Sequence, residues 1–193
     1  MKTILDFPNF RQSFKYDCGA VAVEAVLAYY GIDVPAGKII EMAGTTKRNG
    51  TPIKGIIKVI KKFGLKCSSG PISIDLLKKN ISAGIPVIIP LQAWARGVTE
   101  WKKSWSHGHY VVAIGFDSKR VFFMDPFCFA KTYLSFSELE ERWHDTAAKK
   151  KFIHWGISVW GKKPNYSLHR TVHMDYSSFN PKKAAYSKYL LLK

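Results

Sequence analysis

The first third of the chain repeats its apolar positions with the period of a helix. Helices are expected over residues 18–30, 36–43 and 51–64. Gly31 and Gly64 stand where a helix commonly ends, and Thr51 with Pro52 provides a cap followed by a first-turn residue. Residues 1–11 lack this period and are predicted to form an extended arm.

In the rest of the chain, strand-length apolar runs alternate with two further helical segments. Strands are expected over residues 65–68, 86–91, 110–116, 120–124 and 152–160, and helices over 74–80 and 136–145, the second with Ser135 or Ser137 near its cap. Asp117, Ser118 and Lys119 separate two of these strands and predict a hairpin between them. Because helices come first and antiparallel strands mostly later, the expected fold class is α+β.

Length and composition favour one domain followed by a segment of different character. A chain of 193 residues, 47% of them apolar and 14% aromatic, can bury one core without metals or disulfides. Residues 162–193 hold seven basic residues, one acid and little periodicity. We therefore expect a domain over residues 1–161 and a basic extension over 162–193, which either binds a partner or wraps on the domain.

Cysteine usage and the N-terminus bear on the compartment. Cys18, Cys67 and Cys128 form no Cys-x-x-Cys pair, so free thiols in a reducing compartment are expected. Asp6 and Pro8 interrupt the N-terminal segment, which lacks the apolar core of a signal peptide, and the longest apolar runs are strand-sized. We expect a cytoplasmic location by default and leave export by a dedicated secretion system open. No metal-ligand cluster is visible, so no cofactor is expected.

Thirty basic residues against fourteen acidic ones give a net charge of +16. Such a charge fits an acidic partner, for example nucleic acid, anionic lipid or an acidic protein. Many lysines fall in pairs on predicted helices, such as Lys61 with Lys62, which is typical of solvated helix faces. Because no arginine-rich run with interleaved aromatics occurs, nucleic acid or an anionic surface is the weaker hypothesis. The sequence leaves the oligomeric state open.

Cys18 stands where a reactive thiol would be favoured. It begins a predicted helix, where unpaired N–H groups and the helix dipole stabilise a thiolate. Gly19 would leave the sulfur open to a substrate, and Asp17 could cap the helix. The alternative is a buried structural cysteine. A place at the polar start of the helix, outside its apolar stripe, argues against that alternative.

His109 and Asp125 are predicted to be neighbours. His109 opens one strand of the expected hairpin and Asp125 ends the other, so pairing of the strands brings them together. A carboxylate in that place accepts from one ring nitrogen and fixes the tautomer of the imidazole. Taken alone, His109 also fits a surface histidine beside a loop. Asp125 alone also fits a turn residue before Pro126. His107 would share a face with His109 in a regular strand and is a rival base.

Two further features could complete a site. Gln12 precedes Cys18 by six residues, and its side-chain amide could join the Cys18 N–H in holding an oxyanion. The expected loop over 92–108 carries Trp94, Trp101 and Trp105, which either wall a substrate groove or pack on one another.

The sequence resembles a known peptidase family in several short motifs. Segment 12–20 (QSFKYDCGA) resembles the N-terminal motif of the bacteriocin-processing, double-glycine-leader cysteine peptidases, which are family thirty-nine of clan CA. Segments 108–112 (GHYVV) and 124–126 (MDP) are similar to the histidine and aspartate motifs of this family. Segment 141–145 (ERWHD), like MDP, is similar to stand-alone members. The resemblance covers about residues 8–160.

This resemblance implies a papain-like fold, with an N-terminal helical part packed on an antiparallel sheet. It also implies that Cys18 is the nucleophile, His109 the base, Asp125 its orienting group and Gln12 the oxyanion residue. The family cleaves leader peptides after a Gly-Gly type sequence. Because the chain carries no membrane domain or nucleotide-binding motif of the transporter-fused members, it is expected to be a stand-alone member.

The sequence therefore predicts a cysteine peptidase that hydrolyses a peptide or protein substrate held extended in a groove. Two alternatives on the same fold stay open. One is a peptide-binding module that does not cut. The other is an acyl or peptidyl transferase, in which an amine replaces water as the acceptor.

Overall fold

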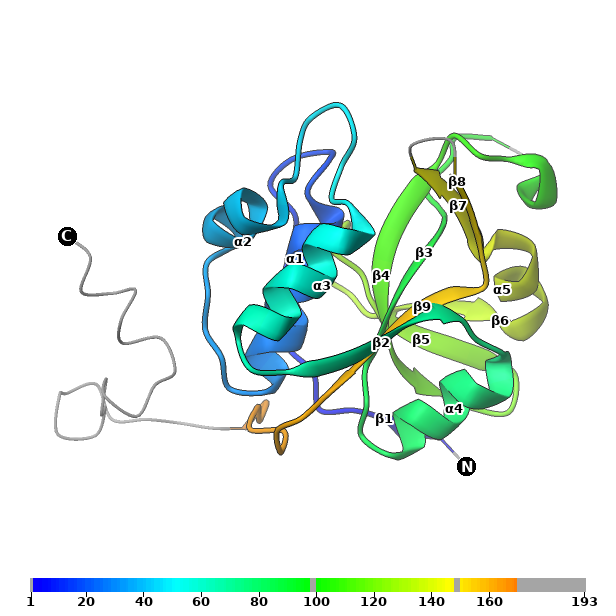
Figure 1. Ribbon diagram of the computed structural model, residues 1–193. Helices are drawn as coiled ribbons and strands as arrows, with labels where there is room; N and C mark the ends of the chain where they lie inside the picture. The colour runs from blue at the N-terminus through cyan, green and yellow to red at the C-terminus, as the bar shows by residue number, and fades with distance from the viewer. Residues whose placement is uncertain (1, 98–99, 148–149, 170–193) are drawn as a thin grey trace, which may run out of the picture.

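The computed structural model describes residues 2–97, 100–147 and 150–169, and it places helices on both sides of an antiparallel sheet. Helices α1, α2 and α3 gather on one side of the molecule, while α4 and α5 lie beside the other part of the sheet (Figure 1). The helices are α1 (Cys18–Tyr29), α2 (Ala36–Ala43), α3 (Ile53–Lys62), α4 (Ile74–Ser82) and α5 (Phe136–Arg142), with a 3-10 turn over Trp101–Lys103. The expected α+β class is confirmed.

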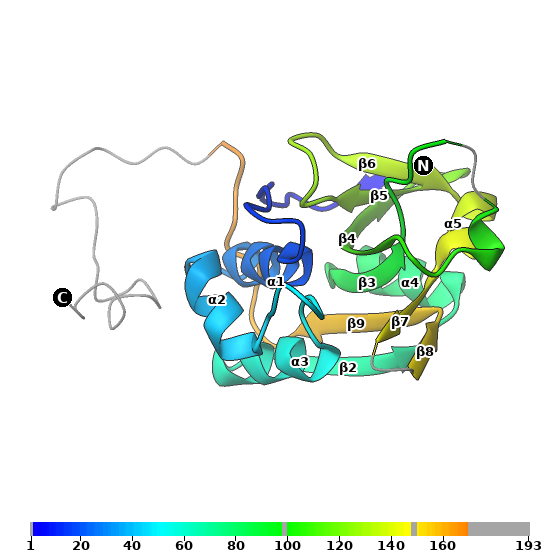
Figure 2. The same cartoon turned by 90° about the horizontal axis from the view of Figure 1, so that it is seen from above.

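The main sheet runs in the order β2-β9-β3-β4-β5-β6, and β1 adds to β4. The strands are β1 (Thr3–Ile4), β2 (Lys66–Pro71), β3 (Val87–Gln92), β4 (Gly108–Phe116), β5 (Arg120–Met124), β6 (Thr132–Ser135), β7 (His144–Ala147), β8 (Lys150–Ile153) and β9 (Trp155–Trp160). All pairs are antiparallel, and β7 with β8 forms a separate hairpin. Seen from above, this hairpin stands across from α3 (Figure 2).

Two predicted elements near the C-terminal end of the domain were wrong in their bounds. The helix expected over 136–145 ends at Arg142, because the chain turns into β7 at His144. The single strand expected over 152–160 is divided at His154, whose φ of 50° breaks the extended backbone between β8 and β9. His154 then donates its N–H to the carbonyl of Trp143, which ties the turn to the end of α5.

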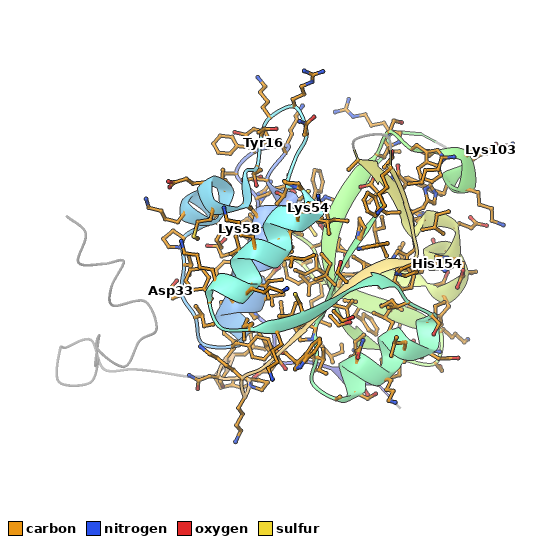
Figure 3. The ribbon with its side chains drawn as sticks, in the orientation of Figure 1. Tyr16, Asp33, Lys54, Lys58, Lys103 and His154 are labelled. Carbon is orange, nitrogen blue, oxygen red and sulfur yellow. The ribbon has the colours of Figure 1, made fainter. Side chains whose placement is uncertain are left out.

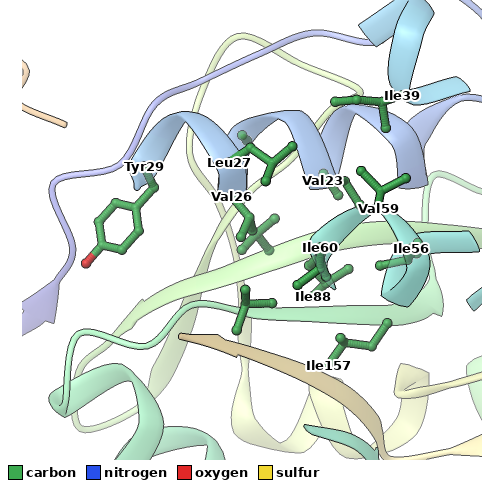
Figure 4. Packing of buried hydrophobic residues seen from close by; sticks show 14 of the residues in the cluster. Val23, Val26, Leu27, Tyr29, Ile39, Ile56, Val59, Ile60, Ile88 and Ile157 are labelled. Carbon is green, nitrogen blue, oxygen red and sulfur yellow. The ribbon is translucent and has the colours of Figure 1, made fainter. Parts of the chain in front are cut away.

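The core lies on both faces of the sheet. On one face, α1 is buried almost all round, since α2 and α3 cover the side that the sheet does not. Figure 4 shows Val26, Ile60 and Ile88 meeting there. On the other face, α4 and α5 close a second cluster that contains Leu77 and the fully buried Trp143. Helix α1 is thereby fixed with its N-terminus at one end of the sheet.

The start of the predicted basic extension packs on the domain. Asn165 and Tyr166 donate their backbone N–H groups to the carbonyl of Tyr29 at the end of α1. Residues 170–193, which make up most of the extension expected over 162–193, lie outside the described residues. The division into 1–161 and 162–193 therefore stays a prediction.

Candidate active site

Cys18 is the first residue of α1 and is 8% exposed. The buried carboxylate of the preceding residue, Asp17, accepts from the backbone N–H groups of Ser13 (3.2 Å) and Phe14 (3.1 Å). Because the Asp17 side chain accepts no hydrogen bond from α1, the prediction that it caps the helix was wrong. Instead it folds the segment before Cys18 into a tight turn, which fixes how the chain enters the helix.

Gly19 lets α1 approach the sheet closely. A methyl group at this position would lie 2.7 Å from Cβ of Thr51 and 2.9 Å from Cδ2 of Tyr110. Such distances are shorter than side chains tolerate, so any larger residue would push α1 away from β4. The glycine therefore sets the spacing between the helix that carries Cys18 and the strand that carries His109.

His109 lies beside Asp125, as the expected hairpin predicts. Strands β4 and β5 pair antiparallel, and His109 Nε2 donates to Asp125 Oδ1 at 2.7 Å. The two side chains are almost completely buried, with 7% of His109 and 2% of Asp125 exposed. The bond to Asp125 occupies Nε2, so the Nδ1 atom of the ring is left for Cys18.

Four hydrogen bonds hold the Asp125 carboxylate. Oδ1 also accepts from the backbone N–H of Phe127 (2.9 Å), and Oδ2 accepts from Trp94 Nε1 (3.1 Å) and Thr132 Oγ1 (3.2 Å). Burial alone would raise the pKa of Asp125, but the bonds from His109, Phe127 and Thr132 outweigh it and lower that pKa. The carboxylate is therefore ionised and fixed at neutral pH.

The pKa of His109 is raised to about 9. Burial lowers it, but the hydrogen bond and charge of Asp125 and those of the Cys18 side chain raise it more. The imidazole therefore interacts with the carboxylate on one side and with the sulfur on the other, and it is charged at neutral pH. The structure thus brings Cys18, His109 and Asp125 together.

Gln12 lies close to this group because its backbone is bonded to Pro126, the residue after Asp125. Its backbone N–H donates to the carbonyl of Pro126 at 2.8 Å, and its side-chain Nε2 donates to the carbonyl of Phe14 at 2.6 Å. Within the described residues, Gln12 Oε1 is buried and has no hydrogen-bond partner. The N-terminal segment is thereby tied to the residue that follows Asp125.

A cleft of about 290 Å³ opens at Cys18 between the helical side and the sheet. The loop between α2 and α3 and the β7–β8 hairpin rise at the same end of the molecule (Figure 1). The walls of the cleft come from the segment before α1, the loop before α3, the start of β4 with the residues before it, and β7. The lining residues are Lys15, Tyr16, Cys18, Lys47, Arg48, Asn49, Gly50, Thr51, Trp105, Ser106, Gly108, Tyr110, Asp145, Thr146 and Ala147. The thiol therefore faces a space that a peptide segment can enter.

Comparison with protein families decides the class of this chain. Residues 6–149, which are most of its length, match the model of the Peptidase C39 family. The chain belongs to the peptidase C39 family. It is therefore a cysteine peptidase, and the resemblance read from its motifs is confirmed.

Solved structures of C39 peptidases share the fold. A C39-like peptidase from Bacillus anthracis is 20% identical with a TM-score of 0.64, covering 86% of this chain and all (100%) of that chain. The peptidase domain of Streptococcus ComA, a bifunctional ABC transporter, is 20% identical with a TM-score of 0.60, covering 79% of this chain and 97% of that one. A double glycine motif protease from an AMS/PCAT transporter, in complex with the leader peptide, is 21% identical with a TM-score of 0.60, covering 83% and 95%. The expected papain-like fold is confirmed, whereas no curated protein matches the chain.

Several other sequence candidates have structural roles in this C39 peptidase. His107, the predicted rival base, bonds through Nδ1 to the hydroxyls of Ser104 (2.9 Å) and Ser106 (3.2 Å). Trp105 lines the cleft, whereas Trp101 stacks under the guanidinium of Arg142, whose carbon lies 4.0 Å from its ring centre. All three cysteines are free thiols, as predicted.

Sequence reasoning missed two residues that hold the Asp125 carboxylate. Trp94 is expected either to wall the groove or to pack on other loop aromatics, but it bonds to Asp125 and stacks on Phe127 with 4.4 Å between ring centres. Its backbone has a φ of 60°, which is uncommon outside glycine. Thr132 lies in the next strand and gave no signal. One contact comes from a loop and the other from the start of β6, and these segments meet only in the folded chain.

Within the described ranges, no group of three or more His, Cys, Asp or Glu side chains is arranged to hold a metal ion. Among the same residues, no helix combines the length and the apolar character that crossing a bilayer needs.

Proposed function

We propose that this C39 peptidase hydrolyses peptide bonds with Cys18 as nucleophile, His109 as acid and base, and Asp125 as the group that orients His109. The observation that carries the proposal is the His109 ring, which bonds to Asp125 at 2.7 Å and interacts on its other side with Cys18. A thiolate next to an imidazolium is the activated form of a cysteine nucleophile. The location of Cys18 at the N-terminus of α1 adds the favourable end of the helix dipole.

The reaction runs in two steps. The Cys18 sulfur attacks the peptide carbonyl, and the tetrahedral oxyanion accepts from the Cys18 N–H and from Gln12. The Gln12 amide has two N–H bonds and gives one to Phe14, which leaves the other for the oxyanion. His109 then protonates the nitrogen of the leaving amine, and the C–N bond breaks. Water, deprotonated by His109, attacks the thioester and releases the carboxylic acid product together with the Cys18 thiol.

The substrate in this proposal is a peptide with small residues at the scissile bond. Cys18 is only 8% exposed and lies beside the packed contact of Gly19 with Thr51 and Tyr110, so bulky side chains have little room there. Cleavage after a Gly-Gly type sequence fits this restriction. The solved double glycine motif protease, which was captured with a leader peptide, has the same fold.

Profiling with an unbiased peptide library tests the proposal. Wild-type protein is expected to give discrete products, and Cys18→Ala is expected to give none while still binding the peptides. Mass spectrometry of the products with an added amine separates hydrolysis from acyl transfer, because transfer adds the mass of the amine. Peptide binding by wild type without any Cys18-dependent product would instead identify a binding module.

A further inference from the structure

One carboxylate on the cleft wall has no part in the reaction described above. Asp145 lies in β7 and lines the cleft that opens at Cys18. Its side chain packs directly on Gly108, the residue before His109, where a methyl group would lie 2.5 Å from Oδ1 and 2.9 Å from Oδ2. The absent side chain at Gly108 is therefore what gives the carboxylate its place at the cleft.

The Asp145 carboxylate is held in a fixed orientation. Its Oδ1 accepts from Thr146 N (2.8 Å) and from Gln92 Nε2 (3.2 Å). Gln92 is completely buried, and its amide also donates to the carbonyl of His144 at 3.1 Å and accepts from His107 N at 2.8 Å. Because the nitrogen and the oxygen of the Gln92 amide are both held by these hydrogen bonds, the Asp145 carboxylate is preorganised rather than free to turn into solvent.

No cation of the described residues forms an ion pair with Asp145. The ionisable groups that face it or share its cleft are Cys18, His109, Tyr110 and His144, with Lys15, Lys47 and Arg48 on the walls of the helical side. Those last three are exposed to water, which screens their charges. Burial raises the pKa of Asp145 to about 6. The hydrogen bonds and charges around the carboxylate therefore offset only part of the cost of burying its negative charge.

We propose that Asp145 is a specificity-determining residue that binds a lysine or arginine side chain of the substrate in the cleft beside Cys18. The proposal rests on the peptidase function given above and adds a substrate class to it. A cation supplied by the peptide pairs with the half-buried carboxylate and removes the cost of leaving it unpaired. A fixed, half-buried carboxylate discriminates between charged and neutral substrate side chains more strongly than exposed lysines do. A charge-assisted hydrogen bond of this kind strengthens binding by about 10- to 100-fold.

The test uses pairs of peptides that differ at one position only, where one peptide has Lys and the other has Gln. This position is placed in turn at each of the four residues before the cleaved bond. In wild type, the Lys peptide is expected to exceed its Gln partner about 10- to 100-fold in kcat/KM at one position. The isosteric Asp145→Asn variant is expected to bring this ratio close to one. Asp33→Asn, which removes the same charge on the far side of the helical group (Figure 3), is expected to leave the ratio unchanged.

The pH dependence of the ratio gives a second readout on the unmodified protein. Protonation of Asp145 below pH about 6 is expected to lower the Lys-to-Gln ratio, whereas any pH effect on the reaction chemistry acts on both peptides alike and cancels. This measurement stands even where Asp145→Asn fails to fold.

Three outcomes overturn the inference: no Lys preference at any position, a preference that survives in folded Asp145→Asn, or a preference that Asp33→Asn also removes. Absence of any Cys18-dependent product is a failure of the proposed function alone. In that case the same peptide pairs are titrated against Cys18→Ala with and without Asp145→Asn. Equal dissociation constants for the Lys and Gln peptides would then refute the role of Asp145.

Discussion

Replacing Asp125 with asparagine removes the charge that helps to keep the proton on the His109 ring. The pKa of His109 rises from 6.5 to about 9 in the folded protein, which corresponds to about 3 kcal/mol of preference for the protonated ring. Burial works against this rise, and Asp125 and Cys18 together produce it. Losing the Asp125 contribution is therefore expected to lower the pKa of His109 by about 1–2 pH units.

The assay is the pH profile of kcat/KM for a peptide substrate. In wild type, activity that needs the imidazolium is lost as the pH rises through about 9. In Asp125→Asn, this alkaline limb is expected to lie about 1–2 pH units lower, which costs roughly two- to tenfold in kcat/KM at pH 8 from the protonated fraction alone. Asp117→Asn, at the turn of the same β4–β5 hairpin, is the matched control and keeps the wild-type limb.

An unchanged alkaline limb in Asp125→Asn, with the variant folded, would show that Asp125 does not set the charge of His109.

The same pair, His109 and Asp125, also affects the stability of the fold. The raised pKa of His109 stabilises the native state fully below pH about 6.5, and this contribution is lost as the pH rises through about 9. The lowered pKa of Asp125 stabilises the native state above pH 3.8, and this contribution is lost as the pH falls through its folded value.

Three further predictions follow from single contacts. Cys18 is expected to react with iodoacetamide faster than a model thiol at pH 7, and equal rates would contradict an activated thiolate. Trp94→Phe removes one hydrogen bond from Asp125 and is expected to lower the free energy of unfolding by about 1 kcal/mol and kcat several-fold, as measured by urea unfolding and peptide turnover. Gly55→Ala places a methyl group against the carbonyl of Ala43 and is expected to cost about 1–3 kcal/mol in the same unfolding assay, while a value near zero would mean that α2 and α3 separate easily.

Contacts made within one hairpin could be predicted from the sequence. The apolar runs over 110–116 and 120–124 with a turn between them were enough to place His109 beside Asp125, because pairing in a hairpin depends only on local order. The extent of α1 followed in the same way from the helical period that begins at Cys18 and from Gly31 beyond its end. Local pattern therefore gave the centre of the site.

Contacts between distant segments could not be predicted. Nothing local to Trp94 shows that its indole reaches Asp125, since the contact depends on a left-handed backbone in a loop. Asp145 falls at the end of a helix predicted over 136–145, because periodicity does not reveal the pairing of β7 with β8. The roles of Cys18, His109, Asp125 and Gln12 in catalysis, and an acidic partner for the basic surface, stay predictions.

The position of β9 in the sheet has a consequence during synthesis on the ribosome. Strand β9 is inserted between β2 and β3, although both are made more than sixty residues earlier. Until residue 160 has left the exit tunnel, β2 has no neighbouring strand in this sheet. The part of the sheet between β2 and β3 is therefore incomplete until then. A nascent chain therefore carries α1 and the β4–β5 hairpin, with Cys18, His109 and Asp125, before the sheet beneath them is complete.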